Sequence, residues 1–215
     1  MEEQLWKACK DGRVEEVQEL LQNSEIKPNW QDFNWERTTS VYIACEHGHI
    51  EIVKLLLNDK RVDINKAKND GWTPFYVVCY KGHIEIVKLL LNDESVEINK
   101  PDNVGRIPFW IACRNRQIEI VKLLLNDERV DINKATNNGF TPFYLACYEG
   151  HIEIVKLLLA CGREIDINKK DDDGKTALNI ARERGKMNIV ELIESFRKAQ
   201  NETRSKLRKE FNLPG

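Results

Sequence analysis

The sequence predicts an all-α solenoid, in which similar helix pairs stack one after another. The first observation is a nonapeptide, His-Ile-Glu-Ile-Val-Lys-Leu-Leu-Leu, which occurs at residues 49–57, 83–91 and 151–159, with a fourth copy that begins at Gln117. The second is a series of cysteines spaced by 36, 34, 34 and 34 residues, namely Cys9, Cys45, Cys79, Cys113 and Cys147. Self-similarity at a period of this length is typical of repeat proteins, whose units pack on their neighbours.

Each unit begins with a turn and a first helix, and the clearest example starts at Asp70. Asp70-Gly71 predicts a tight turn, because glycine accepts the positive φ that other residues resist. Thr73-Pro74 predicts a helix start, since the hydroxyl can accept an early backbone N–H and proline gives up a donor that has no partner there. Gly82 predicts the end of this helix.

A second helix is predicted from about Ile84. Glu85, Lys88 and Asn92 form a narrow polar stripe along it, and apolar side chains occupy the remaining faces. A helix this apolar must be covered by its partner helix and by both neighbouring units. Helices of this length are marginal alone in water, so stacking is what folds the chain.

An extended segment follows each second helix, at Asn92–Lys100 and, closely echoed, at Asn58–Lys66 and Asn126–Lys134. Its Val-x-Ile alternation predicts a strand-like conformation. Turn, helix, turn, helix and extended finger at this period resemble the ankyrin repeat, whose consensus contains Thr-Pro-Leu-His-x-Ala, Gly-His-x-Glu-Ile-Val and Asp-Val-Asn-Ala. The resemblance implies an ankyrin-repeat helical solenoid with short β-hairpin-like fingers.

The resemblance covers roughly residues 1–196, which we expect to form the repeat domain of six units. These are an N-terminal cap around residues 5–29, four internal units whose helices start near Ser40, Pro74, Pro108 and Pro142, and a C-terminal cap that starts near Ala177. Residues 197–215 are expected to form a helical extension that packs on the last unit. A capping residue at Asn201 or Thr203 and the apolar pair Leu207 and Phe211 support that helix.

Two segments depart from the repeat. Arg116-Gln117 replaces Gly-His, which places a non-glycine residue where left-handed geometry is usual, at a cost of about 1 kcal/mol. Ile107 replaces the capping threonine of the same unit, which costs about another 1 kcal/mol. We therefore expect this unit to be the weakest, or to have been selected for something other than stability. The first finger, Lys27–Arg37, is longer than the others, and we expect it to have its own conformation.

Composition excludes several classes of protein. Lys and Arg number 33 against 35 Asp and Glu, so the formal net charge of -2 offers no global attraction to nucleic acid or to an anionic membrane. Neither a signal peptide nor a transmembrane segment is predicted. Because five of the six cysteines recur with the repeat, we expect them to be buried in a reducing compartment, the cytoplasm or the nucleus. Cys161 lies outside the pattern and is expected to be the most exposed thiol.

The combination of cysteine and histidine near Cys45 and His49 could suggest zinc. The other interpretation is stronger, because each such cysteine aligns with a small residue of the first helix and free cysteine packs as a small hydrophobe. The resemblance implies that His49, His83 and His151 bridge loop backbone. The sequence contains no Cys-x-x-Cys pair, phosphate-binding glycine loop or catalytic motif, so we expect no metal, no cofactor and no enzyme activity.

Candidate binding residues are those that vary while the framework repeats. The resemblance implies that a partner meets the finger tips and the solvent-facing side of the first helices, which line a concave groove. The first-helix candidates are Glu46, His47, Tyr80, Lys81, Arg114, Asn115, Tyr148 and Glu149. The finger candidates are Phe33, Asn34, Asn69, Asp70, Trp72, Asn103, Val104, Arg106, Asn137, Asn138 and Phe140. Aromatic residues and arginine dominate interface energies, so binding is favoured for Trp72 and Phe140, and packing for Tyr76, Trp110 and Tyr144.

The sequence therefore predicts a non-catalytic adaptor or regulator that binds another protein or peptide, as a monomer and without a membrane. Tyr80 and Tyr148 are expected on one groove wall with Arg114 between them, which suits a partner with apolar anchors beside an acidic group. An alternative is nucleic-acid or acidic-partner binding through Lys81, Arg114, Arg116 and the basic C-terminal tail, and nucleic acid is the less expected of these partners. A purely structural spacer is a third hypothesis.

Overall fold

The computed structural model describes residues 1–213, which divide into two compact units, Met1–Asn103 and the chain from Val104 onward. Both units are built from helix pairs. We call the first helix of each pair the inner helix and the second the outer helix. Each unit is described by itself below.

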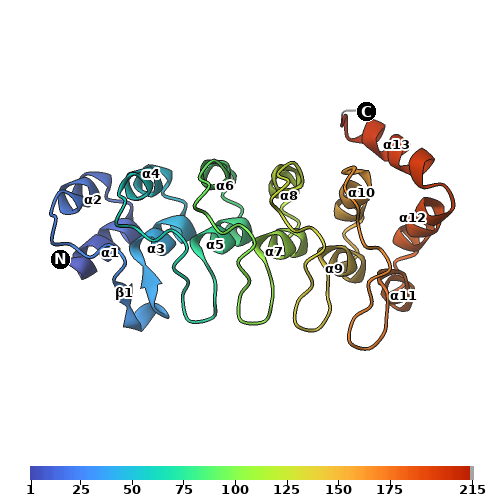
Figure 1. Cartoon of the computed structure of the whole chain (residues 1–215), viewed down its shortest axis with the longest axis horizontal. Helices are drawn as coiled ribbons and strands as arrows, with labels where there is room; N and C mark the ends of the chain where they lie inside the picture. Colours follow the sequence, from blue (N-terminus) through green and yellow to red (C-terminus); the bar gives the residue numbers. More distant parts are fainter. Residues whose placement is uncertain (214–215) are drawn as a thin grey trace. The chain divides into compact units, whose positions relative to one another are not determined.

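In the first unit the inner helices lie side by side, the outer helices form a second row, and loops project from the opposite side of the inner row as fingers (Figure 1). The inner helices are α1 (Glu2–Asp11), α3 (Ser40–His47) and α5 (Pro74–Lys81). The outer helices are α2 (Val14–Leu21), α4 (Ile50–Asn58) and α6 (Ile84–Leu91). The first finger holds β1 (Gln31–Asp32), the 3-10 helix η1 (Phe33–Trp35) and β2 (Thr38–Thr39).

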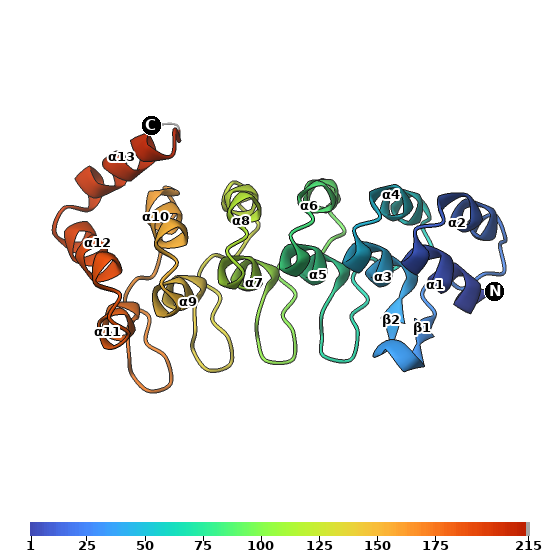
Figure 2. The same cartoon turned by 180° about the vertical axis from the view of Figure 1, so that it is seen from behind.

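The second unit repeats this arrangement and adds one helix (Figure 2). Its inner helices are α7 (Pro108–Arg114), α9 (Pro142–Glu149) and α11 (Ala177–Glu183). Its outer helices are α8 (Ile118–Leu125), α10 (Ile152–Ala160) and α12 (Met187–Lys198). The additional helix is α13 (Gln200–Glu210). Helix α12 thus continues past residue 196, where the sequence predicted the extension to begin.

Helix α13 packs on α10 as well as on α12, so it reaches beyond the last repeat. Leu207 is buried in this contact, and Lys156 Nζ lies 2.6 Å from Glu210 Oε1. Leu157 of α10 is consequently buried, whereas its counterparts Leu89 and Leu123 on outer helices of the same core sequence are only half-buried.

The predicted helix caps are confirmed, and so is the missing side-chain cap at Ile107. Thr73 Oγ1 accepts the Tyr76 N–H at 3.1 Å, and Gly82 ends α5 in the left-handed region at φ 86°. Ile107 makes no side-chain cap at the start of α7. Arg116 lies just beyond the end of α7 at φ 53°, in the left-handed conformation that the sequence predicted.

The core is made by the inner helices and by one face of each outer helix. The five repeating cysteines are fully buried, as predicted, whereas Cys161 is half-buried. Phe75, Phe109 and Phe143 occupy equivalent positions of three inner helices, and each is 1% exposed. Burial of a side chain of this kind contributes roughly 1.5–3 kcal/mol.

The strand-like conformation predicted for the Val-x-Ile segments is wrong. At residues 58–66 the backbone makes turns, with Val62 N–H bonded to Asp59 O at 2.9 Å and Lys66 N–H to Asp63 O at 3.3 Å. Within residues 1–213 the only strands are β1 and β2 of the longer first finger, and a single isolated bridge joins Lys170 and Thr176. Among residues 1–213, the first finger therefore contains a pair of strands, and the later fingers are loops.

The repeating histidines contact backbone, as the resemblance implied, but the contacted carbonyls belong to inner helices of neighbouring repeats and not to loops. His49 Nε2 lies 3.0 Å from Lys10 O, His83 Nε2 lies 3.0 Å from Glu46 O, and His151 Nε2 lies 3.1 Å from Arg114 O. Each ring therefore forms a hydrogen bond with a backbone carbonyl at the C-terminal end of an inner helix in an earlier repeat.

Candidate functional site

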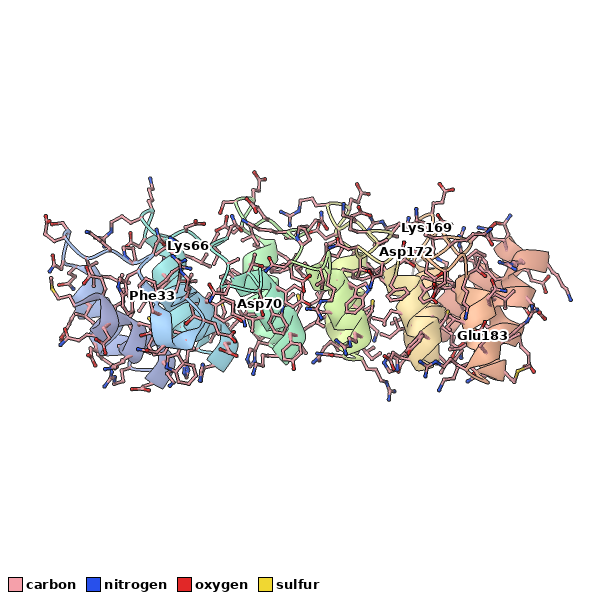
Figure 3. All side chains as sticks on the ribbon, turned by 90° about the horizontal axis from the view of Figure 1, so that it is seen from below. Phe33, Lys66, Asp70, Lys169, Asp172 and Glu183 are labelled. Atoms are coloured by element: carbon pink, nitrogen blue, oxygen red, sulfur yellow. The ribbon has the colours of Figure 1, made fainter. Side chains whose placement is uncertain are left out.

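The candidate residues fall on both compact units, and each unit has a cleft between inner helices and fingers. Figure 3 looks onto the finger side, where Phe33 and Asp70 lie on neighbouring fingers. The first-unit cleft, of about 390 Å³, is lined by Asn34, Trp35, Glu36, Thr38, Tyr42, Glu46, Lys68 and Trp72. The second-unit cleft, of about 300 Å³, is lined by Trp110, Arg114, Phe140, Tyr144, Leu145, Tyr148 and Glu149.

In the first unit, a turn positions Trp72. Asp70 Oδ1 accepts the Trp72 N–H at 3.0 Å, and Gly71 adopts φ 88°. The Trp72 ring then packs on Tyr76 at 4.7 Å and on Tyr80 at 5.1 Å between ring centroids. Tyr76 is fully buried, which confirms the predicted packing role, whereas Trp72 is half-buried and Tyr80 is 37% exposed.

Two of the first unit's candidate residues pair with each other, because Lys81 Nζ lies 3.5 Å from Glu46 Oε1. Lys68 pairs with Asp70 at 2.8 Å and also with Glu36. Burial lowers the pKa of Lys68, but these two carboxylates outweigh that effect and raise its pKa overall. The charges around this cleft are therefore largely compensated within the unit.

Other candidates of the first unit hold the fingers and helix ends. Asn69 N–H donates to Glu36 O at 3.0 Å, and Asn69 O accepts from the Asn103 side-chain amide at 2.9 Å. The exposed His47 ring stacks on His49, and its Nδ1 lies 3.1 Å from Ile43 O. The backbone of Asn69 thus joins successive fingers.

Sequence reasoning missed Trp35, which is 47% exposed beside Phe33, itself 73% exposed. The Trp35 ring lies 5.8 Å from Trp6, and Lys10 Nζ lies 3.8 Å from its centroid. The extra length of the first finger was a signal that could have drawn attention to this residue.

In the second unit, hydrogen bonds from buried aromatic groups fix the floor of the cleft. Trp110 Nε1 donates to Phe140 O at 3.1 Å, and the Tyr144 hydroxyl donates to Asp171 Oδ2 at 2.6 Å. Trp110 and Tyr144 are buried, which confirms their packing role. Burial raises the pKa of Asp171, but the bonds from Tyr144 and from backbone N–H groups outweigh it and lower this pKa overall.

The half-buried Phe140 stacks on Tyr144 with centroids 5.0 Å apart. The Arg114 guanidinium lies 5.8 Å from the centroid of Trp110, and the Arg106 guanidinium lies 5.9 Å from it. The structure therefore brings Arg114, Phe140, Tyr148 and Glu149 together in one cleft. Of the predicted wall, Arg114 and Tyr148 line this second-unit cleft, while Tyr80 belongs to the first unit.

The remaining second-unit candidates lie at the margins. Asn138 is exposed at a finger tip, and its carbonyl accepts the Asp172 N–H at 3.4 Å. Asn115 follows α7 directly, and its N–H bonds to Ile111 O at 3.0 Å.

Residues 1–213 contain no group of three or more His, Cys, Asp or Glu side chains that could hold a metal ion. Burial also raises the pKa of the Cys9 thiol to about 12 and raises the pKa of Cys45, Cys79, Cys113 and Cys147. A protonated thiol is neither a nucleophile nor a metal ligand. The repeating cysteines are therefore suited to packing.

The family model described as ankyrin repeats (3 copies) matches residues 3–68, 58–136, 94–171 and 111–204. The chain is an ankyrin repeat protein. Ankyrin repeats generally mediate protein–protein interactions and are typically non-catalytic. No curated protein matches this ankyrin repeat chain. Among residues 1–213, no helix has the length and apolar character needed to cross a membrane.

Proposed function

We propose that this ankyrin repeat protein is a non-catalytic adaptor or regulator that binds another protein or peptide through its inner helices and fingers. The observation that carries the proposal is the second-unit cleft, where a half-buried Phe140, a half-buried Tyr148 and an exposed Arg114 meet in about 300 Å³. These residue types supply most of the binding energy in protein interfaces.

The cleft is also held in shape by its surroundings. Trp110 and Tyr144 are fixed by hydrogen bonds beneath it, so the groups that line it lose little freedom when a partner binds. A preorganised surface binds more tightly than a mobile one of the same area. The first-unit cleft adds Trp72 and Trp35 as further apolar contacts, and the exposed Tyr80 packs against Trp72.

The basic C-terminal tail supports the alternative of nucleic-acid binding less well. Arg204 Nε donates to Leu159 O and Arg208 Nη1 donates to Ala160 O, each at 3.3 Å. These two arginines satisfy carbonyl groups at the C-terminal end of α10. We accordingly propose that residues 1–196 are the binding domain of a monomeric cytoplasmic or nuclear protein, and that the extension predicted at residues 197–215, of which the structure describes residues 197–213, covers its end.

The test is to select peptides from a displayed random library on the full chain and to measure their affinity for substituted chains. Trp72→Ala and Phe140→Ala together should weaken binding about tenfold or more, because they remove an aromatic contact from each cleft. The matched control replaces Lys54 and Lys88, which are paired with Glu51 and Glu85 on the outer helices, by alanine. Circular dichroism would show that each variant is folded.

The control variant should bind like the unsubstituted chain. If instead it lost affinity while the aromatic variant retained it, the outer face would be the binding surface and the proposal would be wrong.

A further inference from the structure

The arginines of the second unit fall into two groups. Most satisfy an acceptor in the protein, as Arg129 does with Asp127 at 2.6 Å and Arg182 does with Glu194. Arg114, Arg116 and Arg184 make neither an ion pair nor a side-chain hydrogen bond with any residue in the described range 1–213. The three lie at or just beyond the C-terminal ends of inner helices.

Two of these three arginines lie over aromatic rings. The Arg184 guanidinium lies 3.7 Å from the centroid of Tyr148, and the Arg114 guanidinium lies 5.8 Å from that of Trp110. Arg184 was not among the residues that the sequence singled out. A guanidinium held against a ring keeps its N–H edge available, and that planar edge matches the two oxygens of a carboxylate or phosphate.

Arg114 lines the second-unit cleft, and Arg184 lies over Tyr148, which also lines it. Helix α9, which supplies Tyr148 and Glu149, packs on α7 and on α11 (Figure 2). Arg114 ends α7 and Arg184 follows α11. Successive inner helices therefore present an arginine, then the pair Tyr148 and Glu149, then a second arginine.

From this order we infer that the second unit binds an extended acidic peptide. Two oxyanionic side chains of the peptide meet Arg114 and Arg184, and an apolar side chain between them enters the cleft beside Phe140. The inference rests on the proposed function and names the chemistry of its partner.

The spacing of the helices sets the spacing of the peptide's acidic groups. Axes of packed helices lie roughly 8–10 Å apart. Arg114 ends α7 and the Arg184 guanidinium lies over Tyr148 of α9, so the two guanidinium groups are one to two such spacings apart, about 10–20 Å. An extended chain advances about 3.3 Å per residue, so the acidic residues should be about three to six positions apart. The apolar residue should lie near the middle of that interval.

Glu149 favours a peptide over a nucleic acid. It lines the cleft between the two arginines and, within residues 1–213, forms no ion pair. A nucleic acid carries a phosphate at every nucleotide and would place one against this carboxylate, whereas a peptide can place a neutral or basic residue there. Like charges brought together at an interface cost binding energy.

The experiment selects peptides from a displayed random library on the full chain and compares the selected sequences with those taken by Arg114→Gln and Arg184→Gln. We expect two Asp or Glu residues about three to six positions apart around an apolar residue. Either substitution should weaken such a peptide about tenfold or more, because a charge-assisted pair is lost. Arg182→Gln is the matched control on α11, because Arg182 is already paired with Glu194, and it should have little effect.

Synthetic versions of a selected peptide identify the anion. Replacement of either acidic residue of the peptide by Asn should remove the affinity that this residue contributes. Phosphoserine at the same position should show whether the chain prefers phosphate to carboxylate. The inference would be overturned by a single-stranded oligonucleotide that displaces the peptide and binds the chain more tightly than the peptide does.

The outcomes separate this inference from the proposed function. Selected peptides that are neutral or basic, that lose affinity with Phe140→Ala and that ignore Arg114→Gln would contradict the acidic partner alone. Peptides that bind equally well to the Trp72/Phe140 double variant would contradict the proposed function itself.

Discussion

Arg116 is held in a backbone conformation that glycine adopts more easily. Its φ of 53° is left-handed, and its exposed side chain makes no ion pair within residues 1–213, while glycine holds the equivalent position after α5 and α9. We expect Arg116→Gly to stabilise the chain by up to about 1 kcal/mol, measured by urea unfolding. Arg184→Gly is the control, because Arg184 has φ -87° and no such strain to relieve. A loss of stability in Arg116→Gly would contradict this account.

Individual residues were predictable where the repeat is regular. The buried cysteines, the bridging histidines and the buried Tyr76 recur at a fixed spacing, so one packing argument covers every copy. Trp35 and Arg184 were missed because they lie where the repeat is interrupted, in the longer first finger and in the last repeat. The pairing of Glu46 with Lys81 was missed for a different reason, since it joins side chains of successive repeats that were considered separately.

At the scale of the elements, the packing of α13 on the rest of its unit depends mainly on one buried side chain. Leu207 is 3% exposed and packs α13 on α10 and α12, whereas Glu210 adds a partly exposed ion pair. Leu207→Ala should cost about 2–5 kcal/mol if α13 unfolds only with the rest of the chain, and less if it detaches locally. Hydrogen exchange in α13 and the rate of thiol labelling at Cys161, near the end of α10, should both increase.

Lys209→Ala is the matched control for α13, because Lys209 is exposed on the same helix. It should leave exchange and labelling unchanged. An unaltered labelling rate in Leu207→Ala would show that α13 does not protect Cys161.

The elements also show where periodicity misled the prediction. Val96 and Ile98 alternate with polar residues and are each 5% exposed, so the period of two correctly indicated which side chains are buried. The period of two did not indicate strand pairing. Ile98 N–H bonds to Val96 O at 2.9 Å within the same segment, and no strand of residues 1–213 lies beside it to pair with. Burial and pairing are separate properties that one pattern cannot distinguish.

Across the whole molecule, five buried thiols couple folding to alkaline pH. Burial raises the pKa of Cys9 from 9.0 to about 12 and also raises the pKa of the other four. When the pH exceeds the pKa of a thiol in the unfolded chain, the unfolded chain loses thiol protons that the folded chain keeps. Stability should therefore be unaffected by these thiols below pH 9 and fall as pH rises above it, by up to about 1.4 kcal/mol per pH unit for each thiol.

Urea unfolding in the presence of a reductant at pH values of about 8, 9 and 10 would measure this slope. Cys113→Ala removes one of the five thiols and should make the decline shallower. An identical decline in both chains would mean that groups other than these thiols cause it.

The bridging histidines also limit which repeats can follow one another in this chain. A Cβ placed on Gly48 would lie 2.8 Å from His83 Cε1, and one placed on Gly12 would lie 2.8 Å from His49 Cε1. Each glycine is therefore matched to a ring in the repeat that follows it, and in the second unit Gly150 is matched instead to the aliphatic chain of Lys186. Arg116 departs from this rule, because it holds the equivalent position before His151, whose ring still reaches Arg114 O at 3.1 Å. At the glycine junctions, an exchange of repeats that replaced Gly12 or Gly48 by another residue would bring its Cβ against the histidine ring.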